Sequence, residues 1–380
     1  MDSLGSANTT FALDLFRTLS DVAGESRNVF FSPLSISSAL AMVYLGAKGH
    51  TADQMAKVLC FNKAQNVHSD FQALSADINK PAASYLLKLA NRLYGEKTFN
   101  FLPAFLESTQ KFYSADLVPL DFIGASEESR KQINQWVEEQ TESKIKDLLK
   151  PGTVSAVTRL ALVNAIYFKG SWMHKFDGKR TKEMPFKISR FNSKPVQMMF
   201  QTDQYPYRYI PKYRLQVLEI PYQEDELSMF ILLPRSSIFG NALKKLEKEL
   251  TLENIDSWTD RKNMERGIDI CVRLPRFKLE EDYELNTPLG RLGMSDVFDA
   301  GRADLTGMNG QGGLYLSAVV HKAFVEVNEE GTEAAVASAE YVTYSLFQQY
   351  KKFTADHPFL FFIRHNQSRS ILFLGRFCSP

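Results

Sequence analysis

Apolar residues in the first 150 positions recur mostly at the spacing of a helix. Phe11, Leu15 and Leu19 follow one another at every fourth residue, which predicts an amphipathic helix near the start of the chain. A second helix is expected over 36–45 and a third over 126–149. The apolar stripe of the third helix consists of Ile133, Trp136, Val137 and Ile145.

Farther along the chain the apolar pattern changes to that of strands. Between 268 and 274 apolar residues alternate with polar ones, which predicts a strand with one buried face. The continuous apolar run at 229–233 predicts a strand covered on both faces. Two apolar runs, 359–363 and 371–377, flank the polar sequence HNQSRS and predict a buried hairpin. Helices together with largely antiparallel strands place the chain in the α+β class.

A stretch of small side chains interrupts both patterns. Residues 325–339 read VEVNEEGTEAAVASA, and the aromatic sequence YVTYSLFQQYKK follows at 341–352. Alanine, serine and threonine fit a solvated loop, a helix or a strand with little steric cost, so the stretch could change partners. Thr332 before Glu333 is also typical of a helix N-cap. The residues alone leave a surface helix and a moving loop open.

Blocks of sequence along nearly the whole chain resemble those of the serpins. HKAFVEVNEEGTEAA at 321–335 and FTADHPFLFFIRHNQSRSILFLGRF at 353–377 resemble the hinge and the C-terminal strands of that family. The chain is most similar to the ovalbumin-like, intracellular branch and its leukocyte elastase inhibitor group. The other matching blocks are NVFFSPLSISSALAMVYLGAKGHT at 28–51, ANRLYGEK at 90–97, LALVNAIYFKGSW at 160–172, LEIPYQEDELSMFILLP at 218–234, LPRFKLEEDYEL at 274–285 and LGMSDVFDAGRADLTGM at 292–308.

The resemblance implies a complete architecture. It implies a serpin fold of three β-sheets with eight or nine helices, formed as one domain over 1–380. It also implies an exposed reactive-centre loop at about 329–353. The helix that carries Trp136 would cross the face of the central sheet, where that sheet must open. No low-complexity linker or internal repeat divides the chain, in agreement with one domain.

Charge and hydropathy exclude several classes of partner. Lysine and arginine number 45 against 44 acidic residues, a net charge of +1, which gives no electrostatic case for nucleic acid or an anionic membrane as the main partner. The longest apolar run, 39–47, is too short to span a bilayer. Asp14 interrupts the first apolar stretch and no basic start precedes it, so no cleavable signal peptide is expected.

The cysteines indicate the compartment. Cys60, Cys271 and Cys378 are an odd number without C-x-x-C spacing, which argues against both a disulfide framework and a zinc site. A reducing compartment fits this usage best. We therefore expect a cytoplasmic monomer, which could also be released without a cleavable signal peptide.

Motifs of catalytic and cofactor chemistry are absent from the sequence. None of the six histidines stands in an H-E-x-x-H motif, and neither G-x-S-x-G nor G-x-x-x-x-G-K-[ST] occurs. We expect no enzyme activity, no cofactor and no metal. Some serpins bind a heparin-type cofactor, but the stretch 84–92, which we expect to be helical, carries only Lys88 and Arg92. That support is weak.

The resemblance assigns a role to the start of the small-residue stretch. This is the hinge, whose small side chains would let the loop enter the central sheet. By position in the family pattern the hinge consists of Glu330, Gly331, Thr332, Glu333, Ala334, Ala335, Val336 and Ala337.

Two further places carry family roles. The first is the "shutter", whose hydrogen bonds hold two central strands together until the loop inserts; the matching residues are Ser32, Ser35, Asn164 and His321. The second is the top of the sheet, called the breach, where insertion begins and where Trp172 matches the family's tryptophan. A hydrogen-bonded structural histidine and a large core aromatic are the plain alternatives, and both readings can be true together.

The resemblance implies a suicide inhibitor that a protease cuts in the loop. Family spacing places the cut after the seventeenth residue counted from Glu329, which is Ser345, followed by Leu346. A small residue there suits an elastase-like protease, while the neighbouring Tyr344 suits a papain-like cysteine protease. A shift by one residue, with Tyr344 or Leu346 as the main determinant and Phe347 beside it, points to a chymotrypsin-like protease.

Two residues depart from the family pattern. Val336 stands where alanine is usual, a modest enlargement that strands tolerate. Glu340 shares strand parity with Thr332 and would face inward after insertion, where an unpaired carboxylate is costly. A non-inhibitory serpin, acting as a protease substrate, a chaperone or a binding protein, is therefore the alternative.

Overall fold

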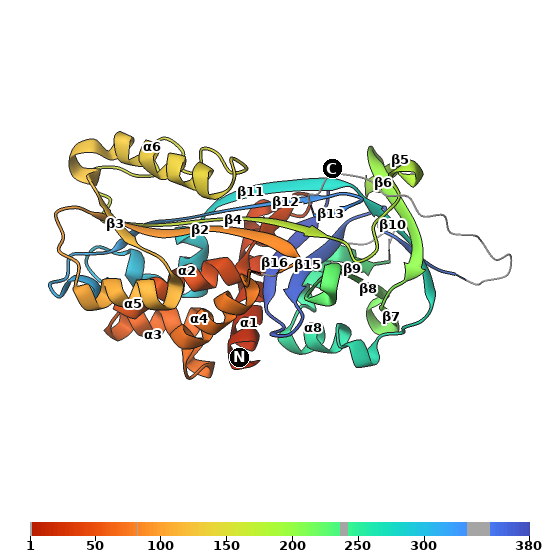
Figure 1. Cartoon of the computed structure of the whole chain (residues 1–380), viewed down its shortest axis with the longest axis horizontal. Helices are drawn as coiled ribbons and strands as arrows, with labels where there is room; N and C mark the ends of the chain where they lie inside the picture. Colours follow the sequence, from red (N-terminus) through yellow and green to blue (C-terminus); the bar gives the residue numbers. More distant parts are fainter. Residues whose placement is uncertain (1, 82, 236–241, 333–349) are drawn as a thin grey trace.

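Three β-sheets surrounded by helices make up the computed structural model, which describes residues 2–81, 83–235, 242–332 and 350–380 (Figure 1). We refer to them as the central, second and third sheets. The central sheet has the order β11 (Phe277–Glu284), β12 (Leu316–Val327), β13 (Gly331–Thr332), β4 (Leu160–Ser171), β2 (Tyr85–Glu96), β3 (Leu117–Leu120).

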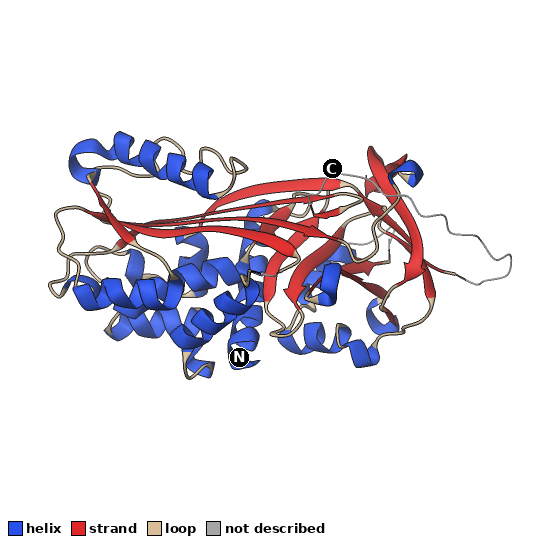
Figure 2. Cartoon of the chain, in the orientation of Figure 1, coloured by secondary structure: helices blue, strands red, loops and turns tan. Residues whose placement is uncertain are grey.

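The second sheet lies below the right half of the central sheet, and the third sheet lies toward the right-hand end of the molecule (Figure 1 and Figure 2). The second sheet has the order β1 (Val29–Phe31), β16 (Ile371–Phe377), β15 (Phe359–His365), β9 (Leu227–Pro234), β8 (Leu215–Pro221), β7 (Tyr207–Ile210). The third sheet has the order β14 (Lys351–Thr354), β10 (Asp269–Pro275), β6 (Asn192–Gln204), β5 (Lys182–Ser189).

The described ranges contain ten α-helices and six short 3-10 helices. The α-helices are α1 (Asp2–Ala23), α2 (Pro33–Gly46), α3 (Gly49–Val58), α4 (Val67–Ile78), α5 (Pro103–Tyr113), α6 (Phe122–Gln140), α7 (Ala242–Lys248), α8 (Leu252–Trp258), α9 (Asn286–Leu292) and α10 (Thr306–Asn309). The 3-10 helices are η1 (Phe61–Lys63), η2 (Gly178–Arg180), η3 (Pro211–Tyr213), η4 (Gln223–Asp225), η5 (Arg261–Asn263) and η6 (Asp296–Phe298). No helix in these ranges is long and apolar enough to cross a membrane.

Several elements form where the apolar pattern predicts them. The first helix buries Phe11, Leu15 and Leu19 completely or nearly so. Strand β10 buries alternate residues, and β9 is buried along its whole length. Strands β15 and β16 pair as the predicted hairpin, and every residue of both is buried. The α+β class and the three sheets are confirmed.

Helix α6 lies across one face of the central sheet, while α2 to α5 lie beneath the other (Figure 1). Ile133 and Val137 belong to an apolar cluster that includes side chains from β2, β4 and β12. Trp136 takes part at the edge, where the Arg92 guanidinium lies 4.0 Å from the centre of its ring. The expected position of the helix that carries Trp136 is therefore correct.

Two predicted helices have different boundaries or a different structure. The helix expected over 126–149 ends at Gln140, because Glu142 and Ser143 adopt left-handed backbone angles that stop it. Ile145 is nevertheless buried, held by its N–H to the Thr141 hydroxyl at 3.2 Å. The stretch 84–92, expected to be helical, lies mostly in strand β2, because long pairing with β4 outweighs its helical propensity.

The number of helices and the boundaries of the loop also differ from those expected. Eight or nine helices were expected, and the described part has ten because it includes the single turn α10. The loop expected at 329–353 is narrower at both described ends. Gly331–Thr332 forms β13, and Lys351–Thr354 forms β14.

Candidate functional site

The parallel pairing of β12 with β4 forms a seam in the central sheet. It runs from Leu316 opposite Leu160 to Phe324 opposite Tyr167. At the end of the seam that lies toward Ser171, which we call its upper end, strand β13 stands between the two strands. Thr332 pairs with Val327 of β12 and with Gly170 of β4, antiparallel to both. The central sheet is thus closed along the seam and holds one extra short strand above it.

His321 and Asn164 join the two sides of the seam. They stand opposite each other in β12 and β4, and the His321 Nδ1 lies 2.6 Å from the Asn164 Oδ1. The Ser32 backbone N–H donates to the His321 Nε2 at 3.1 Å. Because Nε2 accepts this bond, the Nδ1 carries the proton and donates it to Asn164. The histidine is therefore neutral, with a fixed tautomer.

Burial explains the charge state of His321. Its side chain is fully buried, and burial lowers the pKa of His321 to about 3. A charged imidazole would lose the Ser32 N–H as a donor to its Nε2. The hydrogen bonds across the seam consequently depend on the neutral form.

Ser32 and Ser35 connect this pair to the start of α2. Ser32 is the N-cap of that helix, and its hydroxyl accepts from the Ser35 N–H at 3.3 Å and donates to the Leu372 carbonyl at 2.6 Å. Asn164 donates its side-chain N–H to the Ser35 hydroxyl at 2.6 Å. The four residues predicted for the shutter are therefore brought together, in one network that reaches β12, β4, α2 and β16.

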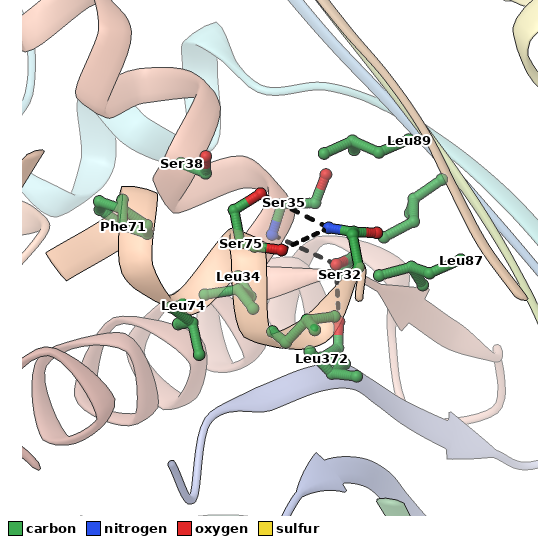
Figure 3. A pocket seen from close by; sticks show the side chains of 13 residues that line it. Ser32, Leu34, Ser35, Ser38, Phe71, Leu74, Ser75, Leu87, Leu89 and Leu372 are labelled. Carbon is green, nitrogen blue, oxygen red and sulfur yellow. Dashed lines mark hydrogen bonds between the residues drawn. The ribbon is translucent and has the colours of Figure 1, made fainter. Parts of the chain in front are cut away.

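A small pocket of about 50 Å³ lies beside this network. Figure 3 shows Ser32 and Ser35 on its wall, with Leu87 and Leu89 of β2 facing Phe71 and Leu74 of α4. The pocket also reaches Ile166 of β4. Side chains therefore do not fill all the space between the central sheet and helices α2 and α4 next to the seam.

Trp172 lies just above the upper end of the seam. Its side chain is fully buried and stacks on Tyr222, with ring centres 4.6 Å apart. Its indole N–H donates to the Asn328 carbonyl at 3.0 Å, and its backbone N–H donates to the Glu330 carbonyl at 2.9 Å. The tryptophan predicted for the breach thus holds the turn that leads into β13.

The hinge residues that the structure describes are fixed tightly. Thr332 is fully buried, and its hydroxyl lies 2.9 Å from the Tyr222 hydroxyl. Gly331 has a φ of +148°, and a Cβ there would lie only 2.0 Å from the Gly170 carbonyl oxygen. Only glycine can bring the chain this close to β4. Two residues of the predicted hinge, Gly331 and Thr332, therefore lie inside the central sheet.

Two acidic residues anchor the chain at the start of the predicted hinge. Glu329 accepts from the Thr181 hydroxyl at 2.6 Å and from the Arg276 guanidinium at 2.5 Å. Burial raises the pKa of Glu329, but these hydrogen bonds outweigh it and lower the pKa below its usual value. Glu330 pairs with Lys175 at 2.6 Å. The chain that enters β13 is thus tied to the end of β10 and to the segment after β4.

The far end of the predicted loop is also held by a sheet. Lys351 begins β14, which pairs in parallel with β10, and its ammonium forms an ion pair with Glu265. The segment 333–349 accordingly starts and ends at two different sheets. Glu333, Ala334, Ala335, Val336, Ala337, Glu340, Tyr344, Ser345, Leu346 and Phe347 lie outside the described residues.

Sequence reasoning did not assign roles to several residues that shape this site. Tyr222, Asn328 and Arg276 hold the breach and the hinge, yet each acts through a partner more than fifty positions away in the chain. All three lie in blocks that resemble the serpins, and this resemblance was the one signal available. Among the described residues, no three histidine, cysteine, aspartate or glutamate side chains gather as a metal site. Cys60, Cys271 and Cys378 are free thiols.

Known proteins share this architecture and sequence. The family model described as serpin (serine protease inhibitor) matches residues 6–380. Leukocyte elastase inhibitor of Homo sapiens is 56% identical over 381 residues, covering 100% of both chains. Leukocyte elastase inhibitor A of Mus musculus is 55% identical with the same coverage. The solved structure of uncleaved ovalbumin has a TM-score of 0.90 and 39% identity over 100% of both chains.

Proposed function

The chain belongs to the serpin family, and we propose that it inhibits a serine or cysteine protease as a suicide substrate. The protease cuts near Ser345 and Leu346, and the freed segment inserts into the seam between β12 and β4. The attached protease is carried along before water completes hydrolysis of the acyl-enzyme. Insertion of this kind is an established example of strand addition driven by stored strain, and we apply it to this chain.

The position of β13 is the observation that carries the proposal. Thr332 already lies between β12 and β4, antiparallel to both, directly above the place where those strands pair with each other. A strand continuing from Thr332 would replace one parallel ladder by two antiparallel ladders. That change adds on the order of ten hydrogen bonds, at about 0.5–1.5 kcal/mol each. Insertion is therefore downhill once the chain is free to move.

The register of β13 specifies where each inserted residue would lie. Thr332 stands opposite Gly170 and Val327, so each later residue meets one position earlier in β4 and β12. Ser338 would then lie between Asn164 and His321. A short hydroxyl side chain fits there and offers those two residues a hydrogen-bond partner in place of each other. This match between the seam and the sequence supports insertion at least that far.

The same register places Glu340 between Leu162 and Val319. Both side chains are buried, with exposures of 0% and 2%. An unpaired carboxylate between them is costly, which favours the second candidate function: a serpin that proteases cleave without being trapped. The small residues before Glu340 and the placement of β13 favour inhibition. We expect insertion to proceed with Glu340 protonated or displaced.

The relatives indicate which proteases to test first. Two of them are named leukocyte elastase inhibitors, and Ser345 as the residue before the cut suits an elastase-like pocket. Chymotrypsin-like and papain-like proteases follow, because Tyr344 and Leu346 flank the bond. We propose that the inhibitor acts as a monomer and without a cofactor.

A gel experiment tests the proposal. The protein is mixed with an elastase-like, a chymotrypsin-like or a papain-like protease and denatured in SDS. We expect, with at least one of them, a band at the mass of the protease plus the inhibitor without its released 346–380 fragment, because the acyl bond survives denaturation. If every protease cleaves the chain and turns over without such a band, the inhibitory function is wrong.

A further inference from the structure

One part of the third sheet places apolar side chains next to lysine and arginine. Strands β10, β6 and β5 are neighbours, with Arg273 opposite Phe200 and Lys182 opposite Met198. Met184 lies on the same face as Lys182, two residues along β5. Met198 is 1% exposed and belongs to the main hydrophobic core, against which Met184 packs. These side chains form an apolar floor on the sheet.

This floor belongs to a pocket of about 340 Å³. Met184, Met198 and Phe200 supply the apolar part of its lining. Its cationic part consists of Lys179, Arg180, Lys182 and Arg273. A volume of roughly 300–1,000 Å³ is typical of sites for small organic molecules, which combine an apolar lining with a few polar groups.

The cations around the pocket are crowded. The guanidinium groups of Arg180 and Arg273 lie 4.1 Å and 5.7 Å from the centre of the same Phe200 ring. Within the described part of the chain, Lys179, Lys182 and Arg273 make no ion pair. Like charges that line one pocket repel each other. A bound anion would relieve this repulsion.

Among the described residues, the carboxylates closest in sequence to the pocket have other partners. Asp177 uses one carboxylate oxygen to accept from the Lys179 backbone N–H at 2.9 Å. Glu329 is occupied by Thr181 and Arg276. The neighbours of Arg273 and Phe200 on the same face are Cys271, Pro275 and Thr202, none of which is acidic. Lys179, Lys182 and Arg273 therefore place three positive charges beside the apolar floor without an ion-pair partner among the described residues.

We infer that this pocket binds a small organic anion, with an apolar body on the floor and a phosphate, sulfate or carboxylate group among the cations. Guanidinium groups bind such anions with paired hydrogen bonds, and ammonium groups add charge. Thr181, which holds Glu329, stands between Arg180 and Lys182. The ligand would thus lie beside the anchor of the hinge. The inference does not depend on the proposed protease inhibition.

Fluorescence titration of the intact protein with 1-anilinonaphthalene-8-sulfonate tests the site, because this probe combines an aromatic body with one sulfonate. The test variant is Lys182→Gln with Arg273→Gln. The matched control is Lys57→Gln with Lys63→Gln, two exposed lysines without ion pairs in the described ranges, at the opposite end of the molecule (Figure 1). We expect one saturable site whose Kd rises about tenfold in the test variant and stays unchanged in the control.

Competition separates an amphipathic site from a simple anion site. We expect phenyl phosphate to displace the probe at a concentration about tenfold lower than inorganic phosphate, because only the former covers the floor. If the double variant unfolds, the single variant Lys182→Gln, which alters an exposed side chain, replaces it as the test variant. Equal Kd values in the test and control variants would overturn the inference. Equal displacement by both phosphates would also overturn it.

Discussion

The hydroxyl groups of Tyr222 and Thr332 lie 2.9 Å apart at the upper end of the seam, and both side chains are sealed from solvent. Burial, opposed in part by this hydrogen bond, raises the pKa of Tyr222 well above its ordinary value. Tyr222 also stacks on Trp172. Thr332 is thus already bound inside the central sheet, so the insertion that we propose would extend an existing strand and would need no new starting point.

Replacing Thr332 with arginine should convert the inhibitor into a substrate. The guanidinium would have to enter a buried site, and an increase of about 1.4 kcal/mol in the insertion barrier slows that step tenfold. Hydrolysis of the acyl-enzyme would then be faster than insertion. We expect the number of inhibitor molecules consumed per protease to rise about tenfold. Thr332→Val, similar in size and apolar, is the matched control and should stay near the wild-type stoichiometry. An unchanged stoichiometry for Thr332→Arg would count against insertion from β13.

Replacing Glu340 with alanine should improve trapping. The register places its carboxylate between buried Leu162 and Val319, so its removal lowers the cost of insertion. We expect fewer inhibitor molecules to be consumed per protease, measured by titrating protease activity. Glu333→Ala is the control, because Glu333 has the opposite parity to Thr332 and would face away from that buried side. Equal effects of the two substitutions would show that the Glu340 carboxylate is not buried.

Replacing Glu329 with glutamine should loosen the anchor of the hinge. The Glu329 side chain is 10% exposed and Arg276 47%, so the partly screened pair contributes about 1–3 kcal/mol together with the Thr181 hydrogen bond. For a chain of this length we expect the Tm to fall by roughly 1–4 °C. Lys278→Gln is the control, since its ion pair with Glu280 is exposed and long at 3.7 Å. A Tm for Glu329→Gln equal to that of the control would refute the anchor.

His321 should make stability depend on pH. The folded protein holds its pKa at about 3, whereas an unfolded histidine titrates near about 6.5. Between these values the unfolded state binds the extra proton, so the contribution is complete above about pH 6.5 and is lost as pH falls toward 3. The slope is at most about 1.4 kcal/mol per pH unit.

Urea unfolding at pH 7 and pH 5 measures this contribution. His68 shifts in the same direction because burial lowers its pKa to about 4, so the comparison requires variants. We expect His321→Gln to lose part of the pH dependence of the unfolding midpoint, and His50→Gln, an exposed residue, to retain all of it. The same slope in both variants would show that the seam does not depend on neutral His321.

Local patterns predicted the elements whose faces are decided by their own residues. The four-residue spacing of Phe11, Leu15 and Leu19, and the alternation over 268–274, specify a buried face whatever the partner is. The helix predicted for the stretch 84–92 was wrong. Its leucines also fit a helix, and only the long pairing of β2 with β4 selects a strand. Secondary structure that is decided by a distant partner cannot be read from one segment.

The candidate site also has residues that the sequence predicted and contacts that it did not. The resemblance to serpins predicted four residues for the shutter, and the structure places these four in one hydrogen-bond network. The resemblance did not predict that Arg276 and Thr181 hold Glu329, or that Tyr222 holds Thr332. These contacts join positions 53, 148 and 110 residues apart. Their geometry follows from the packing of whole sheets.

Thermal unfolding before and after one cut in residues 333–349 tests most directly whether the intact chain is held short of its most stable form. Ten added ladder bonds amount to about 10 kcal/mol, and a chain of this length has an unfolding entropy near 0.8 kcal/mol per degree. We therefore predict that the cut protein melts at least about 10 °C higher than the intact one. A cut protein that melts at the same temperature or lower would contradict the account.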